Sequence, residues 1–302
     1  MKFILSILFK IFHTLKINSR VINFLNNKRY NANDGYNFQN KIEKLLIDKK
    51  LIALDIGSQG GFNSDNFFSK DYNKYFKAVL VDPLQSSKRG ENNENFINKG
   101  LWSSKTKKKL YILGKRPESS SLYEPDSRLL NIHDFKKKNY HLFDVTETKD
   151  IECDTISSSL NSFNIKELDY LKIDTQGSEF EIIKGLGDFR PLLIKCEVQI
   201  HSMYKNVPSW NQLLNLLYEL NYMVIDWKTI GFHSTRSPVE ADMIFIPDFK
   251  KESGKKLILN KQKEFISLML ISGQIKILQK ISENINLEHS EYFMKIKDRY
   301  FF

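Results

Sequence analysis

Cysteine is scarce in this sequence of 302 residues, which holds only Cys153 and Cys196. Two thiols are too few for a disulfide framework or a thiolate zinc site, and they suit a reducing compartment. Neither has a histidine partner at motif spacing, so we expect both to fill core volume. The sequence also lacks a repeat with a period of roughly 20 to 50 residues, which excludes solenoid and propeller architectures.

Acidic residues are missing from the first 33 positions, which hold six basic residues. Residues 249–302 hold 11 basic and 6 acidic residues, so that residues 34–248 contribute only −1 to the formal net charge of +10. A domain that binds nucleic acid is expected to have its basic surface on the folded body. The nearly neutral body therefore argues against nucleic acid as a partner.

No apolar run approaches the roughly 20 residues that a transmembrane helix needs. The best candidate, within residues 1–17, is broken by Lys10, and no small-residue cleavage site of a secretory signal follows it. Its apolar residues recur at helical spacing, which predicts an amphipathic basic helix. Two interpretations stay open: the helix packs on the body, or residues 1–20 contact an anionic lipid surface. The expected location is the cytoplasm, at the inner face of the membrane in the second case.

Short apolar runs alternate with helical patterns along residues 50–248, and this alternation predicts a mostly parallel sheet covered by helices on both faces. We expect strands at 51–56, 77–82, 96–102, 108–113, 140–145, 151–156, 168–173, 192–198, 222–226 and 242–246, and helices at 62–69, 158–164, 178–184 and 210–220. The loop before the last strand is too short for a crossover, so that strand should run antiparallel.

The predicted fold class is therefore a doubly wound α/β domain over 50–248, with helical extensions at 1–49 and 249–302. The C-terminal extension should become helical from Glu264. Its apolar positions suit packing on the body or on the N-terminal helix. A helix that binds a partner is the other possibility.

Two of the predicted strands have an acidic residue at or next to their carboxyl end. Asp55 is followed by Gly57 and Gly61, and Asp82 ends the second strand 27 positions after Asp55. Glycine lets the backbone approach a ligand, and a carboxylate at this spacing can accept hydrogen bonds from ribose hydroxyls. The sequence predicts a nucleotide-binding site at these strand ends.

Two common nucleotide motifs are missing. A dinucleotide fingerprint needs glycine where this chain has Gln59 and Phe62, and no P-loop motif occurs. A ligand that has a ribose but no pyrophosphate fits the loop better. S-adenosylmethionine is such a ligand.

A longer motif lies in the second half of the body. The segment LKIDTQGSEFEIIKG (171–185) resembles the signature L-K-I-D-x-[EQ]-G-x-E-x-x-x-L-K-G of the FkbM family of S-adenosylmethionine-dependent methyltransferases. The segment LDIGSQGG (54–61) is similar to that family's L-D-V-G-A-N-x-G, and VDP (81–83) is similar to its acid-proline pair. With CEVQ (196–199) and ADMIF (241–245), the resemblance spans roughly residues 50–248.

The resemblance implies a seven-stranded sheet that binds S-adenosylmethionine over the carboxyl ends of its strands and methylates a hydroxyl of a sugar, glycolipid or small metabolite. Contacts to the cofactor are expected from Asp55, Gly57, Ser58, Gln59, Gly61 and Asp82. The acceptor pocket should come from loops at 114–140, 199–209 and 227–240, and residues 119–123 resemble a segment near the family's active site. No Asn-Pro-Pro-Tyr-like segment or Pro-Cys nucleophile of nucleic-acid methyltransferases appears.

Methylation of a hydroxyl needs a group that takes its proton. The candidates are Asp174, Glu197 and His201, although Asp174 equally suits capping backbone amides or holding the donor's positive end. Glu179 fits a capping role at the start of a helix better than a role as a base. A divalent metal ion held by Asp174 and its neighbours stays an open alternative, although no ligand spacing demands one.

A function of a different class also fits the sequence. Ser58 and Gln59 stand where the family usually has alanine and asparagine. A membrane-peripheral scaffold that has kept the sheet and lost turnover is therefore the alternative to an active methyltransferase.

Overall fold

The computed structural model describes residues 38–47, 49–84, 95–230 and 238–296. Residues 1–20, for which the amphipathic helix and the lipid contact are predicted, lie outside the described residues. Among the helices described, none is long and apolar enough to cross a bilayer.

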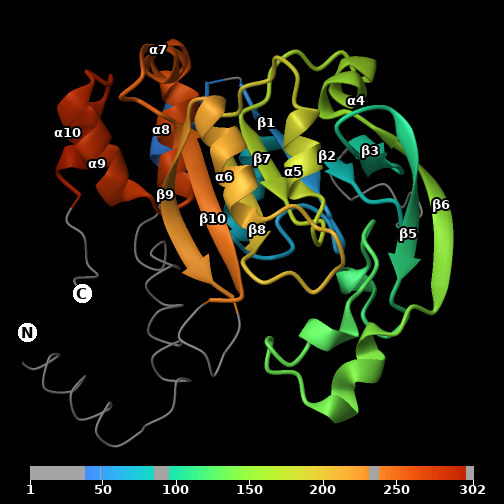
Figure 1. Cartoon of the computed structure of the whole chain (residues 1–302). Helices are drawn as coiled ribbons and strands as arrows, with labels where there is room; N and C mark the ends of the chain where they lie inside the picture. Colours follow the sequence, from blue (N-terminus) through green and yellow to red (C-terminus); the bar gives the residue numbers. More distant parts are fainter. Residues whose placement is uncertain (1–37, 48, 85–94, 231–237, 297–302) are drawn as a thin grey trace, which may run out of the picture.

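A seven-stranded sheet forms the centre of the molecule (Figure 1). Its order is β3-β2-β1-β7-β8-β10-β9, and its strands are β1 (Leu51–Ile56), β2 (Phe76–Val81), β3 (Asn95–Ile97), β7 (Tyr170–Ile173), β8 (Leu193–Gln199), β9 (Tyr222–Thr229) and β10 (Glu240–Pro247). The chain extends the sheet from β1 first in one direction and then, from β7 on, in the other. Ligands of open α/β sheets bind at such a reversal.

The strand directions agree with the sequence prediction. β1, β2, β3, β7 and β8 pair in parallel, whereas β10 pairs antiparallel with both β8 and β9. β1 and β7 are buried along nearly their whole length, as expected of parallel strands covered on both faces. The predicted antiparallel last strand is confirmed.

Helices cover the two faces of the sheet with two separate apolar clusters. One cluster contains residues of α4 (Ile156–Ser162), α5 (Glu179–Lys184) and α6 (Trp210–Glu219). The other contains residues of α3 (Gln39–Leu45), α7 (Glu252–Asn260), α8 (Gln262–Ile271), α9 (Ile275–Asn284) and α10 (Ser290–Met294). The C-terminal helices thus pack on the body and begin at Glu252, earlier than the predicted Glu264. In α8, every residue from Glu264 to Ile271 is buried.

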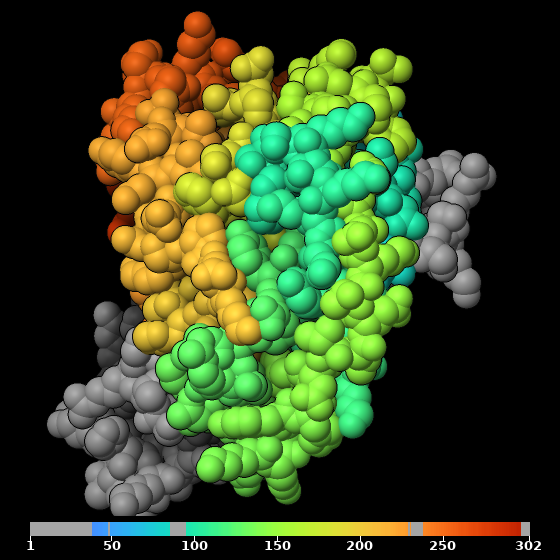
Figure 2. Space-filling view, turned by 45° about the vertical axis from the view of Figure 1, so that its right-hand side comes forward, coloured from blue at the N-terminus to red at the C-terminus, as the bar shows by residue number. Residues whose placement is uncertain are grey.

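A second, three-stranded sheet was not foreseen. It has the order β4-β6-β5 and consists of β4 (Gly100–Leu101), β5 (Thr106–Ile112) and β6 (Glu147–Asp154). The single strand predicted at 96–102 is wrong, because β3 joins the large sheet and β4 the small one. The segment between β5 and β6 forms a green lobe beside the yellow and orange later segments in Figure 2.

Two further predicted elements are wrong. Residues 62–69, predicted as a helix, form turns in which Asn63 and Asn66 have positive φ angles, followed by the 3₁₀ helix η1 (Lys70–Tyr75). The turns let Phe67 and Phe68 fold back on Tyr170. Residues 140–145, predicted as a strand, lie mostly within the 3₁₀ helix η4 (Lys137–Phe143). Only Phe143 of that helix is buried, and it belongs to the apolar cluster of the lobe. The lobe also contains two more 3₁₀ helices, η2 (Pro117–Ser119) and η3 (Ser127–Leu129).

Candidate active site

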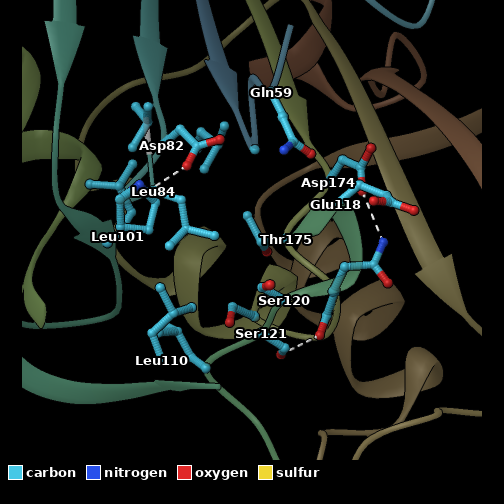
Figure 3. A pocket seen from close by; sticks show the side chains of 18 of the residues that line it. Gln59, Asp82, Leu84, Leu101, Leu110, Glu118, Ser120, Ser121, Asp174 and Thr175 are labelled. Atoms are coloured by element: carbon cyan, nitrogen blue, oxygen red, sulfur yellow. Dashed lines mark hydrogen bonds between the residues drawn. The ribbon is translucent and has the colours of Figure 1, made fainter. Parts of the chain in front are cut away.

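A cavity of about 310 Å³ opens at the carboxyl ends of β1, β2 and β7, where the strand order reverses. Figure 3 shows its two unlike parts. Apolar side chains, among them Leu84, Leu101 and Leu110, surround one part, and Ile151 and Ile182 also line the cavity. Polar groups surround the other part, among them Gln59, Glu118, Ser120, Ser121, Asp174, Thr175 and Gln176. A cavity of this size and mixed lining suits a small ligand with an apolar and a charged end.

Gly57 brings the loops after β1 and β7 into contact. Its φ angle is +78°, which favours glycine, and its backbone N–H donates to the carbonyl oxygen of Val81 at 3.0 Å. A Cβ atom at this position would lie 1.8 Å from the carbonyl oxygen of Asp174. Only glycine lets the two loops approach this closely, and Gly57 itself lines the cavity.

The predicted cofactor residues divide into two groups. Gly57, Gln59 and Asp82 line the cavity. The carboxylate of Asp82 accepts a hydrogen bond from the backbone N–H of Leu84 at 2.7 Å, which fixes its direction at the end of β2. Asp82 thus follows β2 directly and lines the cavity.

Asp55, Ser58 and Gly61 are not among the lining residues. Asp55 is 2% exposed and accepts from the backbone N–H of Asn63 at 3.3 Å. Ser58 is fully buried, with its hydroxyl 3.4 Å from the carbonyl oxygen of Val81. These two side chains therefore hold the loop from the side that faces away from the cavity. Gly61 lies in open space, since a Cβ atom there would meet no atom within 4 Å.

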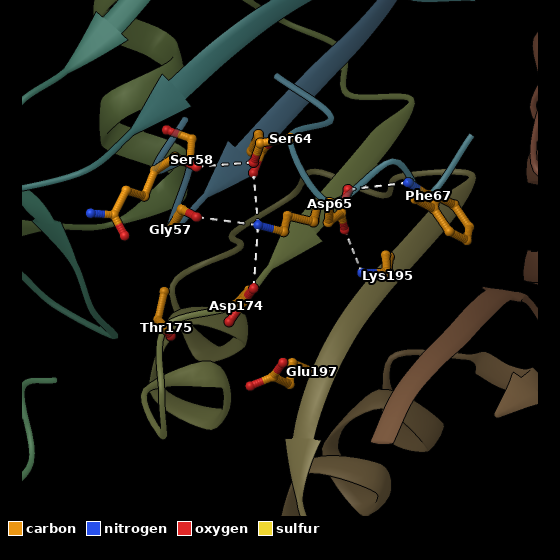
Figure 4. Close-up of polar contacts among 12 residues, drawn as sticks. Gly57, Ser58, Ser64, Asp65, Phe67, Asp174, Thr175, Lys195 and Glu197 are labelled. Atoms are coloured by element: carbon orange, nitrogen blue, oxygen red, sulfur yellow. Dashed lines mark hydrogen bonds and ion pairs between the residues drawn. The ribbon is translucent and has the colours of Figure 1, made fainter. Parts of the chain in front are cut away.

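A buried lysine joins the two loops, and the sequence reasoning missed it. The Nζ atom of Lys172 lies 3.3 Å from a carboxylate oxygen of Asp55 and 3.5 Å from Oδ2 of Asp174, and it donates to the carbonyl oxygen of Gly57 at 3.2 Å. Figure 4 shows the contacts from Gly57 and Asp174 converging on one ammonium group, and Lys172 lines the cavity. The sequence pattern that could have revealed it is a lysine inside an apolar strand, because a charged side chain is buried only when it is paired.

Lys195, the register partner of Lys172 on β8, is buried in the same manner. Its Nζ atom lies 2.6 Å from Asp65 (Figure 4) and 3.0 Å from Asp242. Asp65 belongs to the loop after β1, so this second ion pair also ties that loop to the sheet. This face of the sheet is therefore apolar near the start of β1 and is occupied by buried ion pairs near the end of β1.

The three candidates for the proton acceptor lie in different environments. Asp174 lines the cavity and its side chain is 30% exposed. Glu197 does not line the cavity, and burial together with the nearby Asp174 and Glu240 raises its pKa well above the usual value. His201 is exposed and lies outside the lining, while its carbonyl oxygen lies 2.7 Å from the ring Nε2 of His133. Of the three, only Asp174 faces the cavity.

Glu179 has the capping geometry that the sequence predicted. One of its carboxylate oxygens accepts from the backbone N–H groups of Thr175 and Gly177 and from the Thr175 hydroxyl, at 3.0 to 3.1 Å. These bonds hold the turn between β7 and α5. Cys196 is fully buried and burial raises its pKa, which agrees with a role in the core.

Two serine side chains that line the cavity have environments that the sequence did not predict. Ser121 donates from its hydroxyl to the carbonyl oxygen of Gln176 at 2.7 Å and so joins the lobe to the turn after β7. The hydroxyl of Ser178 is buried, lines the cavity and has no hydrogen-bond partner among the described residues. Among the described residues, no group of three or more His, Cys, Asp or Glu is arranged to hold a metal ion.

Sheet order, reversal point and cavity are those of an α/β protein that binds a nucleotide-like ligand, and they are compatible with a methyltransferase fold. A comparison with protein families gives the same class. The family model of the methyltransferase FkbM domain matches residues 32–224, and the chain belongs to this family. No curated protein sequence matches the chain.

Gly57→Ala should abolish the close approach of the two loops, because its Cβ would collide with the backbone of Asp174. We expect a loss of several kcal/mol of unfolding free energy, or no folding, measured by chemical denaturation. Gly61→Ala is the matched control: its φ of +91° imposes similar strain without a collision, so it should cost only about 1 kcal/mol. Equal losses in the two variants would contradict the role given to the Gly57 contact.

Proposed function

We propose that the chain is an S-adenosylmethionine-dependent methyltransferase that acts on a hydroxyl of a sugar, glycolipid or small metabolite. The observation that carries this proposal is the cavity at the strand-order reversal, with Asp82 at one end and Asp174 at the other. Membership of the FkbM methyltransferase family supports the reaction class.

The residues around the cavity fit this cofactor. Asp82 would accept hydrogen bonds from ribose hydroxyls, and the apolar part of the cavity would pack against the adenine ring. Asp174 supplies a negative charge at the polar part, which suits a cationic group. The Ser178 hydroxyl, buried and without a partner among the described residues, offers one more hydrogen bond. When bound, S-adenosylmethionine would supply an electrophilic methyl group on a sulfonium.

We assign proton acceptance to Asp174. It is the only one of the three predicted candidates whose side chain reaches the cavity, and a base must lie within hydrogen-bond reach of the proton it takes. One carboxylate oxygen faces Lys172 and the other faces the amide of Gln176. These contacts fix the orientation of the carboxylate before an acceptor binds.

The lobe after β5 is the proposed acceptor side. Its apolar cluster joins Leu113, Leu130 and Phe143 to Met203 and Tyr204, so that two of the three loops predicted for the acceptor form one body. A backbone bridge between Pro125 and Tyr204 ties them further. Of the third predicted loop, residues 231–237 lie outside the described residues.

Asp82→Ala should weaken binding of S-adenosylmethionine at least tenfold in calorimetry, because the ribose hydroxyls lose a charged acceptor. The matched control is Asp188→Ala, which removes an exposed carboxylate far along the chain and should leave the affinity unchanged. Absence of binding by the unaltered protein, or undiminished binding by Asp82→Ala, would overturn the cofactor assignment.

Asp174→Asn should abolish release of S-adenosylhomocysteine in the presence of a glycan pool, because the amide cannot take the proton. Unaltered protein that binds the cofactor but releases no product with any acceptor pool would favour the scaffold alternative. Mass spectrometry of polysaccharide and glycolipid from cells with and without the protein would then identify the acceptor by a missing methyl group.

We further propose a peripheral membrane contact through residues 1–20, which rests on the basic amphipathic pattern of the sequence. Deletion of these residues should abolish co-sedimentation with vesicles that contain anionic lipid, while neutral vesicles should bind neither form. Equal sedimentation of the full chain and the shortened chain would contradict the membrane contact and favour packing of this helix on the body.

A further inference from the structure

Gln176 occupies an unusual position at the polar end of the cavity. Its φ angle is +58°, in the left-handed region that side chains other than glycine and asparagine rarely adopt. It lies in the turn directly after β7, two residues beyond Asp174, and its carbonyl oxygen accepts from Ser121. Such a backbone conformation persists only where the surrounding contacts hold it.

The side-chain amide of Gln176 connects the two carboxylates. Its Nε2 atom donates to Oε1 of Glu197 at 2.7 Å and to Oδ1 of Asp174 at 3.2 Å. Each of the two amide hydrogens thus has an acceptor. No other described side chain hydrogen-bonds to both of these carboxylates.

The oxygen of the amide faces the donor of Gln199, whose Nε2 donates to Oε1 of Gln176 at 3.3 Å. The Tyr204 hydroxyl, which donates to the carbonyl oxygen of Ser119 at 2.6 Å, lies 3.2 Å from the same oxygen. Gln199 is oriented in turn by Ser202, whose hydroxyl donates to its Oε1 at 3.0 Å. With carboxylates on one side and a donor on the other, the amide has one favourable orientation.

Charge makes this arrangement necessary. Asp174 and Glu197 repel one another when both are ionised, and because Glu197 is buried the repulsion is screened less than in water. The charged groups that act on Glu197 come from several elements: Asp174 after β7, Glu179 on α5, and Glu240 and Asp242 on β10. All are acidic, whereas Lys172 faces Asp174 and Lys195 faces Asp242.

We propose that Gln176 is a positioning residue that holds Asp174 and Glu197 as a pair and aims the Asp174 carboxylate into the cavity. The contact with Oδ1 from Gln176 and the contact with Oδ2 from Lys172 leave that carboxylate one orientation. The catalytic meaning of this role rests on the proposed function, whereas the pairing itself does not.

Gln176→Met tests the pairing, because methionine keeps the length of the side chain and removes both donors. We expect the pKa of Glu197 to rise by about one pH unit, since the ionised form loses a hydrogen bond. The measurement is a ¹³C-carboxyl NMR titration of protein labelled at glutamate, with the resonance assigned by Glu197→Gln. An unchanged titration of Glu197 would overturn the proposal.

Gln212→Met is the matched control. Gln212 belongs to the capping box at the start of α6, with its side chain accepting from the backbone N–H of Ser209. Its loss should lower the melting temperature and leave the titration of Glu197 in place. A purely structural role of Gln176 would give the same pattern as this control.

Gln176→Glu keeps the proposal testable if the methionine variant does not fold. A third carboxylate between Asp174 and Glu197 can be accommodated only with a proton, so its pKa in the folded protein should exceed the unfolded value. The native state then binds more protons than the unfolded state. Stability relative to the unaltered protein should therefore be retained below about pH 4 and fall as the pH rises from there through the folded pKa. A difference that stays constant from pH 4 to pH 8 would overturn the proposal.

These titrations need neither cofactor nor acceptor, so they separate two failures. Loss of cofactor binding in the unaltered protein would remove the proposed function and leave the NMR result to decide the pairing. Normal cofactor binding with an unmoved Glu197 titration would remove the positioning role alone.

Discussion

The buried ammonium group of Lys172 is the interaction on which the site depends. It lies between the carboxylates of Asp55 and Asp174, from two adjacent strands, and contacts the carbonyl oxygen of Gly57. An unpaired charge in this place would be very costly, so the lysine and its partners must be present together. The strand order reverses between β1 and β7, and the cavity opens at this point. The contacts of Lys172 therefore fix the distance between the loop after β1 and the loop after β7.

Most of the sheet could be predicted, because its strands are short apolar runs that end in charge or glycine. The strands at 51–56 and 168–173 correspond to β1 and β7, and the antiparallel β10 followed from the length of one loop. Residues 62–69 could not be predicted, because their apolar residues also suit a helix. The turns at Asn63 and Asn66 are held by contacts with other segments, such as Phe68 on Tyr170 and the backbone N–H of Asn63 on Asp55.

The site was predictable in its acidic residues and less so in the groups that orient them. Asp82 and Asp174 follow from their positions at strand ends, and Glu179 follows from its place in the first turn of α5. Lys172 is marked only as a charge inside an apolar strand and Gln176 by nothing local, and the partners of both come from other strands. Asp55 and Ser58 matched the motif yet support the loop from behind, a distinction that spacing alone does not contain.

The buried helix α8 has a consequence for how the chain folds during synthesis. Leu51 on β1 belongs to the same apolar cluster as Phe265 and Leu268 on α8, about 200 residues later in the chain. One face of the sheet therefore stays uncovered until the C-terminal helices have left the ribosome, and such distant contacts form slowly. The stretch that matches the family, residues 32–224, ends before these helices and before β10. Expressed alone it would expose an apolar sheet face, so the boundary of the family match is not the boundary of the folding unit.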